Sequence, residues 1–348
     1  MFARFRSRLN RSSRSITIEE FISATYLAVL ERKPTHWEVE HWQAVLIESG
    51  DPASIAAEIA LSDEAQGIAG TRHPLLFAPL GHFSNPIADP PTLKHHYSTR
   101  VTSLQEFRSL PGLNIDGERF KARLPKIAAH FRHLDSLGAF DNYDFSNGSF
   151  SWGDAIAYSH MLAEYQPTKI FEVGSGHSTQ LATNVLDALG LTKTAVTCVE
   201  PFPQLVDSLV DSRRFALMVE PLKPQHIESV STLQSGDILF IDSTHVAKSG
   251  SDVLLETLHM IPTLNDGVLI HIHDIFWPFE YPYEWAVTER RNWNEIYLVH
   301  ALLIDNPKLE VLFFNDWAQR FLRDDLQQLV PEFLNNPGGS LWLRRKAD

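Results

Sequence analysis

Short apolar runs recur at regular intervals in the second half of the chain. They cover residues 170–173, 195–199, 215–219, 238–241, 268–272, 309–314 and 341–343. Runs that are apolar at nearly every position, rather than at alternate ones, are typical of parallel strands buried on both faces. The first five runs are joined by helix-sized connections, so we predict a doubly wound α/β sheet. The last two runs could pair antiparallel at one edge.

The first half of the chain has a different pattern, with helical spacing of apolar residues between residues 16 and 66. Each of three helices there begins with a start signal: Thr17 with Glu20, Thr35 with Glu38, and Asp51 with Pro52. Residues 71–115 are rich in proline and indicate a linker, and a single helix around Phe120–Phe131 leads into the main domain. We therefore predict a disordered basic tail over 1–15, a helical module over 16–70, a linker with its lead-in helix over 71–144, and an α/β domain over 145–348.

Composition excludes several classes of protein. The chain has 348 residues, a formal charge of −13 and 44 % hydrophobic residues, which describes a globular protein and opposes nucleic-acid binding. Cys198 is the one cysteine, so there is no disulfide framework, and a reducing, cytoplasmic location is expected. No apolar stretch reaches the ~20 residues that a membrane-spanning helix needs.

The strongest chemical signal is a glycine-rich turn after the first strand of the predicted sheet. Glu172 lies in that strand, and Gly174-Ser175-Gly176 lead into a helix. Glycines let a ligand approach the backbone closely, and the N–H groups at a helix start attract anions. The spacing is not that of a dinucleotide motif, because Thr179 stands where a third glycine would be, and the lysine of a nucleotide-binding P-loop is missing.

An acidic residue at the end of the second strand completes a nucleoside site. Glu200 follows Glu172 by twenty-eight positions and can accept both hydroxyls of a ribose. A ribose site without a pyrophosphate site indicates S-adenosylmethionine. The predicted cofactor-binding residues are Glu172, Gly174, Ser175, Gly176, Ser178, Glu200 and Asp242.

Two further strand ends carry polar residues that should converge near the glycine turn. Asp242 and His245 follow the fourth strand, and His273 and Asp274 follow the fifth. Asp242, His273 and Asp274 could hold a divalent cation such as Mg²⁺ or Mn²⁺, or the carboxylates could bind substrate directly. His245 has the pKa range of a general base and, with Asp242, is the predicted catalytic group. His271 is interpreted as a core residue.

An aromatic segment follows Asp274. Its rings are Trp277, Phe279, Tyr281, Tyr283 and Trp285. Such a segment suits stacking on a sugar or an aromatic substrate, and it equally suits a packed lid over the core.

The motifs described above make residues 145–348 resemble a class I S-adenosylmethionine-dependent methyltransferase. The resemblance implies a seven-stranded Rossmann-like sheet with the last strand antiparallel. The segments around Glu172–Thr179, Phe240–His245, His271–Ile275 and Gly338–Leu343 resemble a bacterial branch of small-molecule methyltransferases, whose neighbours include metal-dependent sugar O-methyltransferases and cephalosporin-hydroxylase-like proteins. In those neighbours acids at the positions of Asp242 and Asp274 hold a metal, and His273 replaces an acid that is frequent there. Residues 26–64 resemble phycobilisome-linker repeats.

The leading prediction is therefore methyl transfer from S-adenosylmethionine to a hydroxyl of a small molecule such as a saccharide. The helical module would tether the enzyme or make it a homo-oligomer. Two alternatives remain open: a non-catalytic binding or scaffold protein that works through the helical module, and a metal-dependent hydroxylase on the same fold.

Overall fold

The computed structural model describes residues 16–30, 32–62, 82, 84–211 and 213–346. The predicted basic tail, residues 1–15, lies outside this range. Residues 63–81 and 83, at the end of the predicted helical module and the start of the predicted linker, also lie outside it. The chain forms two compact units, residues 1–92 and 93–348. Within the described residues, no helix is both long enough and apolar enough to cross a membrane.

The first unit contains the three predicted helices, α2 (Ile18–Val29), α3 (His36–Ser49) and α4 (Pro52–Leu61). The two capping boxes form as expected, at Thr17 and Thr35, and the Asp51 side chain caps α4. These caps satisfy backbone N–H groups that have no partner inside the helix. A small apolar core fixes the packing of the helices, and it consists of Ile22, Tyr26, Leu30, Ile55 and Ile59.

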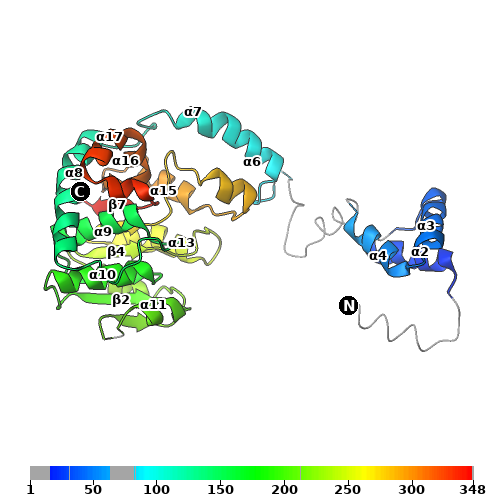
Figure 1. Ribbon diagram of the computed structural model, residues 1–348, viewed down its shortest axis with the longest axis horizontal. Coiled ribbons are helices and arrows are strands. Elements are labelled where there is room, and N and C mark those ends of the chain that lie inside the picture. Colours follow the sequence, from blue (N-terminus) through cyan, green and yellow to red (C-terminus); the bar gives the residue numbers. More distant parts are fainter. Residues whose placement is uncertain (1–15, 31, 63–81, 83, 212, 347–348) are drawn as a thin grey trace. The chain divides into compact units, whose positions relative to one another are not determined.

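The second unit is built on a seven-stranded sheet (Figure 1). Its strands are β1 (Lys169–Val173), β2 (Ala195–Val199), β3 (Ala216–Met218), β4 (Ile238–Ile241), β5 (Leu269–Ile272), β6 (Leu309–Phe314) and β7 (Leu341–Arg345). The order is β3-β2-β1-β4-β5-β7-β6, and β7 runs antiparallel to both of its neighbours. All seven predicted strands are confirmed, and so is the α/β, Rossmann-like fold with a helical N-terminal region.

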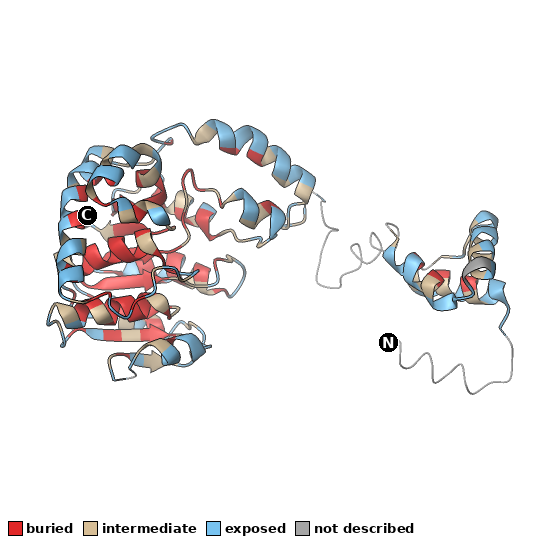
Figure 2. Cartoon of the chain, in the orientation of Figure 1, coloured by how far each residue is buried: buried red, intermediate tan, exposed pale blue. Residues whose placement is uncertain are grey.

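Helices cover the sheet, whose central strands are buried (Figure 2). Before β1 come α6 (Pro90–His96), η1 (Tyr97–Val101), α7 (Thr102–Leu104), α8 (Gly117–Ser136) and α9 (Trp152–Tyr165). Between β1 and β5 lie α10 (His177–Ala188), α11 (Gln204–Leu209), α12 (His226–Ser231), α13 (Asp252–Leu255), η2 (Glu256–Met260) and α14 (Ile261–Thr263). After β5 come η3 (Glu284–Thr288), α15 (Glu295–Leu303), α16 (Asn315–Phe321), α17 (Arg323–Leu329) and η4 (Pro331–Asn335).

The lead-in helix α8 belongs to the core of the second unit. Phe120 on α8 is fully buried, and its ring lies 5.6 Å from that of Phe313 on β6. The proline-rich stretch before α8 also contains helical structure over residues 90–104. The hydrophobic core of the α/β unit therefore begins well before residue 145, where the change in apolar pattern put the start of the domain.

Candidate functional site

The glycine turn brings three strand ends together. Gly174 follows β1 with a φ of +80°, a conformation that favours glycine. Its N–H donates to the carbonyl of Val199 at the end of β2, at 3.0 Å. A Cβ added to Gly174 would lie only 2.0 Å from the carbonyl oxygen of Asp242, at the end of β4. The backbone can pass so close to its neighbours only because residue 174 has no side chain.

Glu200 lies directly over this turn. The N–H of Ser175 donates to Glu200 Oε2 at 3.2 Å, and the N–H of Phe202 donates to Oε1 at 2.7 Å. Each carboxylate oxygen can accept a second hydrogen bond, so both keep capacity for the hydroxyls of a ribose. Ser175 Oγ and His177 Nδ1 are buried beside the turn without a hydrogen-bond partner. Buried polar atoms normally have partners, which makes this turn a candidate ligand site.

Glu172 supports the turn from beneath. Its side chain is fully buried and accepts hydrogen bonds from Ser178 Oγ at 2.5 Å and Thr179 Oγ1 at 2.9 Å. Burial raises the pKa of Glu172 to about 7, although the hydrogen bonds from Ser178, Thr179 and Cys198 oppose the shift. Glu172 and Ser178 therefore bind each other inside the protein and hold the first turn of α10 against β1.

The raised pKa of Glu172 predicts a pH-dependent contribution to stability. Between its usual pKa of 4.5 and about 7, the folded protein keeps a proton that the unfolded chain releases, so stability falls as pH rises through this window. Glu172→Gln removes this titration. We expect the wild type to lose up to ~3 kcal/mol relative to this variant between pH 4.5 and 7.5. Urea unfolding of both proteins across this range measures the difference, and parallel pH profiles would contradict the prediction.

The predicted polar residues at the ends of β4 and β5 also meet. His245 Nε2 lies 3.5 Å from Asp242 Oδ1 and 3.5 Å from Asp274 Oδ2. Its Nδ1 lies 2.8 Å from Glu295 Oε2, at the start of α15. His245 and Glu295 are almost fully buried, whereas the side chains of Asp242 and Asp274 are 31 % and 15 % exposed. The two aspartates therefore form the accessible face of this cluster.

The charges in the cluster are strongly coupled. Burial alone would raise the pKa of Asp242, but the charges of His273 and His245 outweigh it and lower this pKa to about 2. Burial alone would lower the pKa of His245, but Asp242 and Glu295 hold it well above its usual value. Burial raises the pKa of Asp274, and the nearby imidazoles oppose the shift. His245 is thus an imidazolium at neutral pH, enclosed by three carboxylates.

The structure does not support the three-ligand metal site predicted from Asp242, His273 and Asp274. The His245 ring reaches both aspartates, so it lies between the two carboxylates that would share the cation. His273 Nε2 lies 3.2 Å from the carbonyl oxygen of Ser149, which fits donation by the ring rather than metal ligation. Among the residues that the structure describes, no group of three His, Cys, Asp or Glu side chains could hold a metal ion. We derive no chemical step through a metal.

The aromatic segment divides into two parts. Trp277, Phe279 and Tyr281 are buried and form part of the hydrophobic core, as a packed lid requires. Tyr283 is exposed and Trp285 is half-buried, so these two rings alone could face a ligand. The sequence could not separate the two parts, because aromatic residues recur at every second position from 277 to 285.

Sequence reasoning missed two residues of this site. Glu295 binds the ring of His245 from fifty positions away. The ring of Trp293 packs against His245 with the centroids 4.4 Å apart. Neither residue belongs to a recognisable motif. The one available signal was that Glu295 starts an apolar helix and closely follows Trp293.

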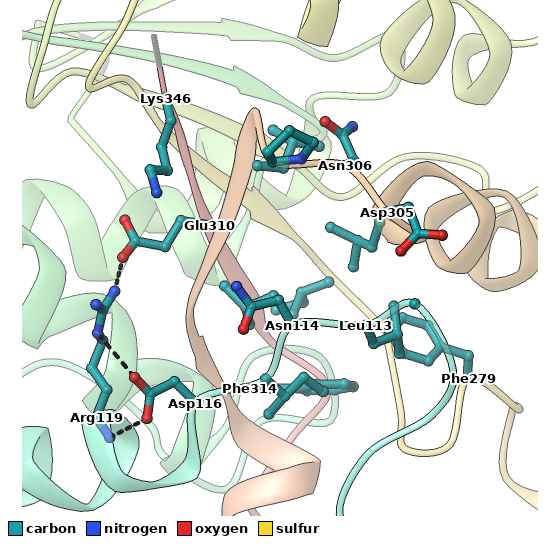
Figure 3. Close-up of a pocket in the computed structure, with 17 residues that line it drawn as sticks. Leu113, Asn114, Asp116, Arg119, Phe279, Asp305, Asn306, Glu310, Phe314 and Lys346 are labelled. Atoms are coloured by element: carbon teal, nitrogen blue, oxygen red, sulfur yellow. Dashed lines mark hydrogen bonds and ion pairs between the residues drawn. The ribbon is translucent and has the colours of Figure 1, made fainter. Parts of the chain in front are cut away.

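One cavity of about 560 Å³ lies elsewhere, along the edge strand β6 (Figure 3). Arg119 pairs there with Asp116 and Glu310, and Phe279 and Phe314 line its apolar part. Neither the glycine turn nor Asp242 or Asp274 lines it. The cavity is therefore separate from the candidate site.

A comparison with known protein families gives a match that covers the strand ends of the candidate site. Residues 171–275 match the family model of a methyltransferase domain. The matched segment contains the glycine turn, Glu200, Asp242 and Asp274, but it is less than a third of the chain. An uncharacterized protein of Archaeoglobus fulgidus is 23 % identical over 177 residues, which cover 46 % of this chain and 75 % of that protein.

Solved structures show only distant likeness. A crystal structure of a candidate O-methyltransferase from Klebsiella pneumoniae is 12 % identical, with a TM-score of 0.36, over 64 % of this chain and 90 % of that one. A structure described as PigF with SAH is also 12 % identical, with a TM-score of 0.30, over 100 % of this chain and 97 % of that one. At such scores these structures carry no argument about this chain.

Proposed function

We propose that the chain is an S-adenosylmethionine-dependent methyltransferase that acts on a hydroxyl of a small molecule. The observation that carries this proposal is the position of Glu200 on the glycine turn, where its carboxylate keeps unused acceptor capacity. The adenosyl ribose would bind Glu200, and the amino-acid part would lie along Gly174–Gly176. The match to a methyltransferase domain over residues 171–275 supports the same conclusion.

In this proposal the acceptor hydroxyl lies over Asp242 and Asp274. Methyl transfer is an in-line displacement at the sulfonium carbon, so the main task of the protein is to align the two substrates. The hydroxyl proton then needs an acceptor. We predicted His245 for this role, but its surroundings keep the ring protonated. Asp274, whose pKa is raised, is the better base of the two accessible aspartates, and the imidazolium of His245 fixes both carboxylates in place.

A saccharide or a related metabolite is the acceptor class that we propose. Carboxylates at the strand ends and half-buried indole rings beside them suit a polyhydroxylated ring. The helical unit has its own core, and we propose for it a tethering or oligomerising role.

Calorimetric titration with S-adenosylhomocysteine tests the proposal. Wild-type protein is expected to bind this ligand, and Glu200→Gln is expected to bind it roughly 10–100-fold more weakly, because a charged acceptor of two ribose hydroxyls is lost. Glu228→Gln removes the same charge from an exposed position on α12 and should leave binding unchanged. No binding by the wild type would favour a non-enzymatic binding protein, and equal binding by Glu200→Gln would mean that Glu200 does not hold the ribose.

A further inference from the structure

The backbone around Arg291 adopts an unfavourable conformation on both sides. Arg290 and Asn292 have φ values of +55° and +54°. Two other non-glycine residues with positive φ, His245 and Asp274, belong to the candidate site. Residues in this conformation persist where the surrounding structure enforces them. The turn at 290–292 is thus held in a fixed shape.

This turn places the guanidinium of Arg291 against two indole rings. Its central carbon lies 3.9 Å from the ring centroid of Trp285 and 4.6 Å from that of Trp293. The backbone N–H of Arg291 donates to the carbonyl of Trp285 at 3.1 Å. The two rings meet edge to face at 79°, and contact with both of them orients the guanidinium.

Arg291 has unused hydrogen-bonding capacity. Nε donates to Glu289 Oε2 at 2.6 Å, and within the described residues neither Nη group has a hydrogen-bond partner. The side chain is 30 % exposed, so the two Nη groups can reach a ligand. A guanidinium with a free edge is suited to bidentate binding of a carboxylate or phosphate.

The position of Arg291 connects it to the proposed acceptor site. Trp293, which stacks on Arg291, also packs against the ring of His245. Burial raises the pKa of Asp274, and the charge of Arg291 is among the influences that lower it. Arg291 is therefore a cation at the rim of a cluster whose accessible groups are otherwise the carboxylates Asp242 and Asp274.

We propose that Arg291 is a specificity residue that binds an anionic group, a carboxylate or a phosphate ester, on the sugar whose hydroxyl is methylated. This inference rests on the proposed methyl transfer and narrows its acceptor to an acidic sugar. A neutral sugar would leave the Nη groups of Arg291 without a partner when it excluded water from them, and this cost disfavours its binding.

Binding to protein saturated with S-adenosylhomocysteine tests the proposal, with methyl β-D-glucuronide, glucose 1-phosphate and methyl β-D-glucoside as probes. We expect at least one of the two anionic sugars to bind about 10-fold more tightly than the neutral glucoside. Arg291→Gln should abolish this preference, and Arg291→Lys should keep part of it. Arg290→Gln removes the same charge from the neighbouring, exposed residue and should leave the preference intact. Which anionic sugar binds distinguishes a uronate from a sugar phosphate.

Four results would overturn the proposal. They are tighter or equal binding of the neutral glucoside, an unchanged preference in Arg291→Gln, equal losses in Arg291→Gln and Arg290→Gln, and absence of binding by all three sugars. Each result is read on protein that binds S-adenosylhomocysteine, so it leaves the cofactor site established. Failure of the proposed function would instead appear as failure to bind that ligand.

Discussion

Gly174→Ala is expected to abolish binding of S-adenosylhomocysteine and to destabilise the fold by about 3 kcal/mol. The new methyl group would lie 2.0 Å from the carbonyl oxygen of Asp242, which is backbone and cannot rotate away. The residue would also have to keep a φ of +80°. Relief of the clash must separate the ends of β1 and β4, and this movement displaces the turn on which Glu200 is held. We expect affinity to fall at least 100-fold in calorimetry and the urea midpoint to fall.

Gly190→Ala is the matched control. Gly190 follows α10 with a φ of +71°, close to that of Gly174, but a Cβ there would meet no atom within 4 Å. Gly190→Ala therefore has the cost of a left-handed alanine, about 1–2 kcal/mol, without the clash. Normal ligand affinity in Gly190→Ala with lost affinity in Gly174→Ala assigns the effect to the close approach of the strands. Equal effects in the two variants would mean that left-handed backbone strain alone is responsible.

The strands were predictable because they are short and largely apolar, and the central ones are buried on both faces. The central strand β4, for example, has four buried residues and no polar one. The helices of the first unit were predictable from local capping at Thr17, Thr35 and Asp51. The start of the α/β unit was not, because α8 joins the core through Phe120 and its contact with Phe313, nearly two hundred residues away. No local pattern encodes such a contact.

The half of the site around the glycine turn was predictable for a topological reason. The carboxyl ends of parallel strands lie at one edge, so Gly174, Glu200 and Asp242 had to approach one another once the strands were assigned. The other half depends on the long segment after β5. Arg291 reaches the site from a turn, and Glu295 reaches it from the start of a helix. Tertiary packing sets the positions of both.

The metal site shows what residue types alone cannot determine. Asp242, His273 and Asp274 have suitable chemistry at suitable strand ends, but spacing does not give the direction of a side chain. His245 has a φ of +58°, and its ring points back between the two aspartates. Glu295 then binds the other side of that ring. The carboxylates that were predicted to share a cation instead share an imidazolium.

Asp274→Asn is expected to slow methyl transfer by roughly 10²–10⁴-fold, the usual contribution of a positioned general base. The amide keeps the size of the side chain and can still accept a hydrogen bond from His245, but it cannot take up the hydroxyl proton. S-adenosylhomocysteine should bind within about 2-fold of wild type, because Asp274 follows β5 and Glu200 follows β2. Labelled methyl transfer from S-adenosylmethionine to the best acceptor among methyl glycosides measures the rate, and calorimetry measures the affinity.

Asp324→Asn, on the exposed face of α17, removes an equal charge away from the site and should keep the wild-type rate. A loss in Asp274→Asn that appears only in KM would mean that the carboxylate binds the acceptor and another group takes the proton. An unchanged rate would mean that Asp274 is not the base. His245 would then be the next group to substitute, because a bound sulfonium next to the aspartates would repel the positive charge of its ring and favour release of its proton.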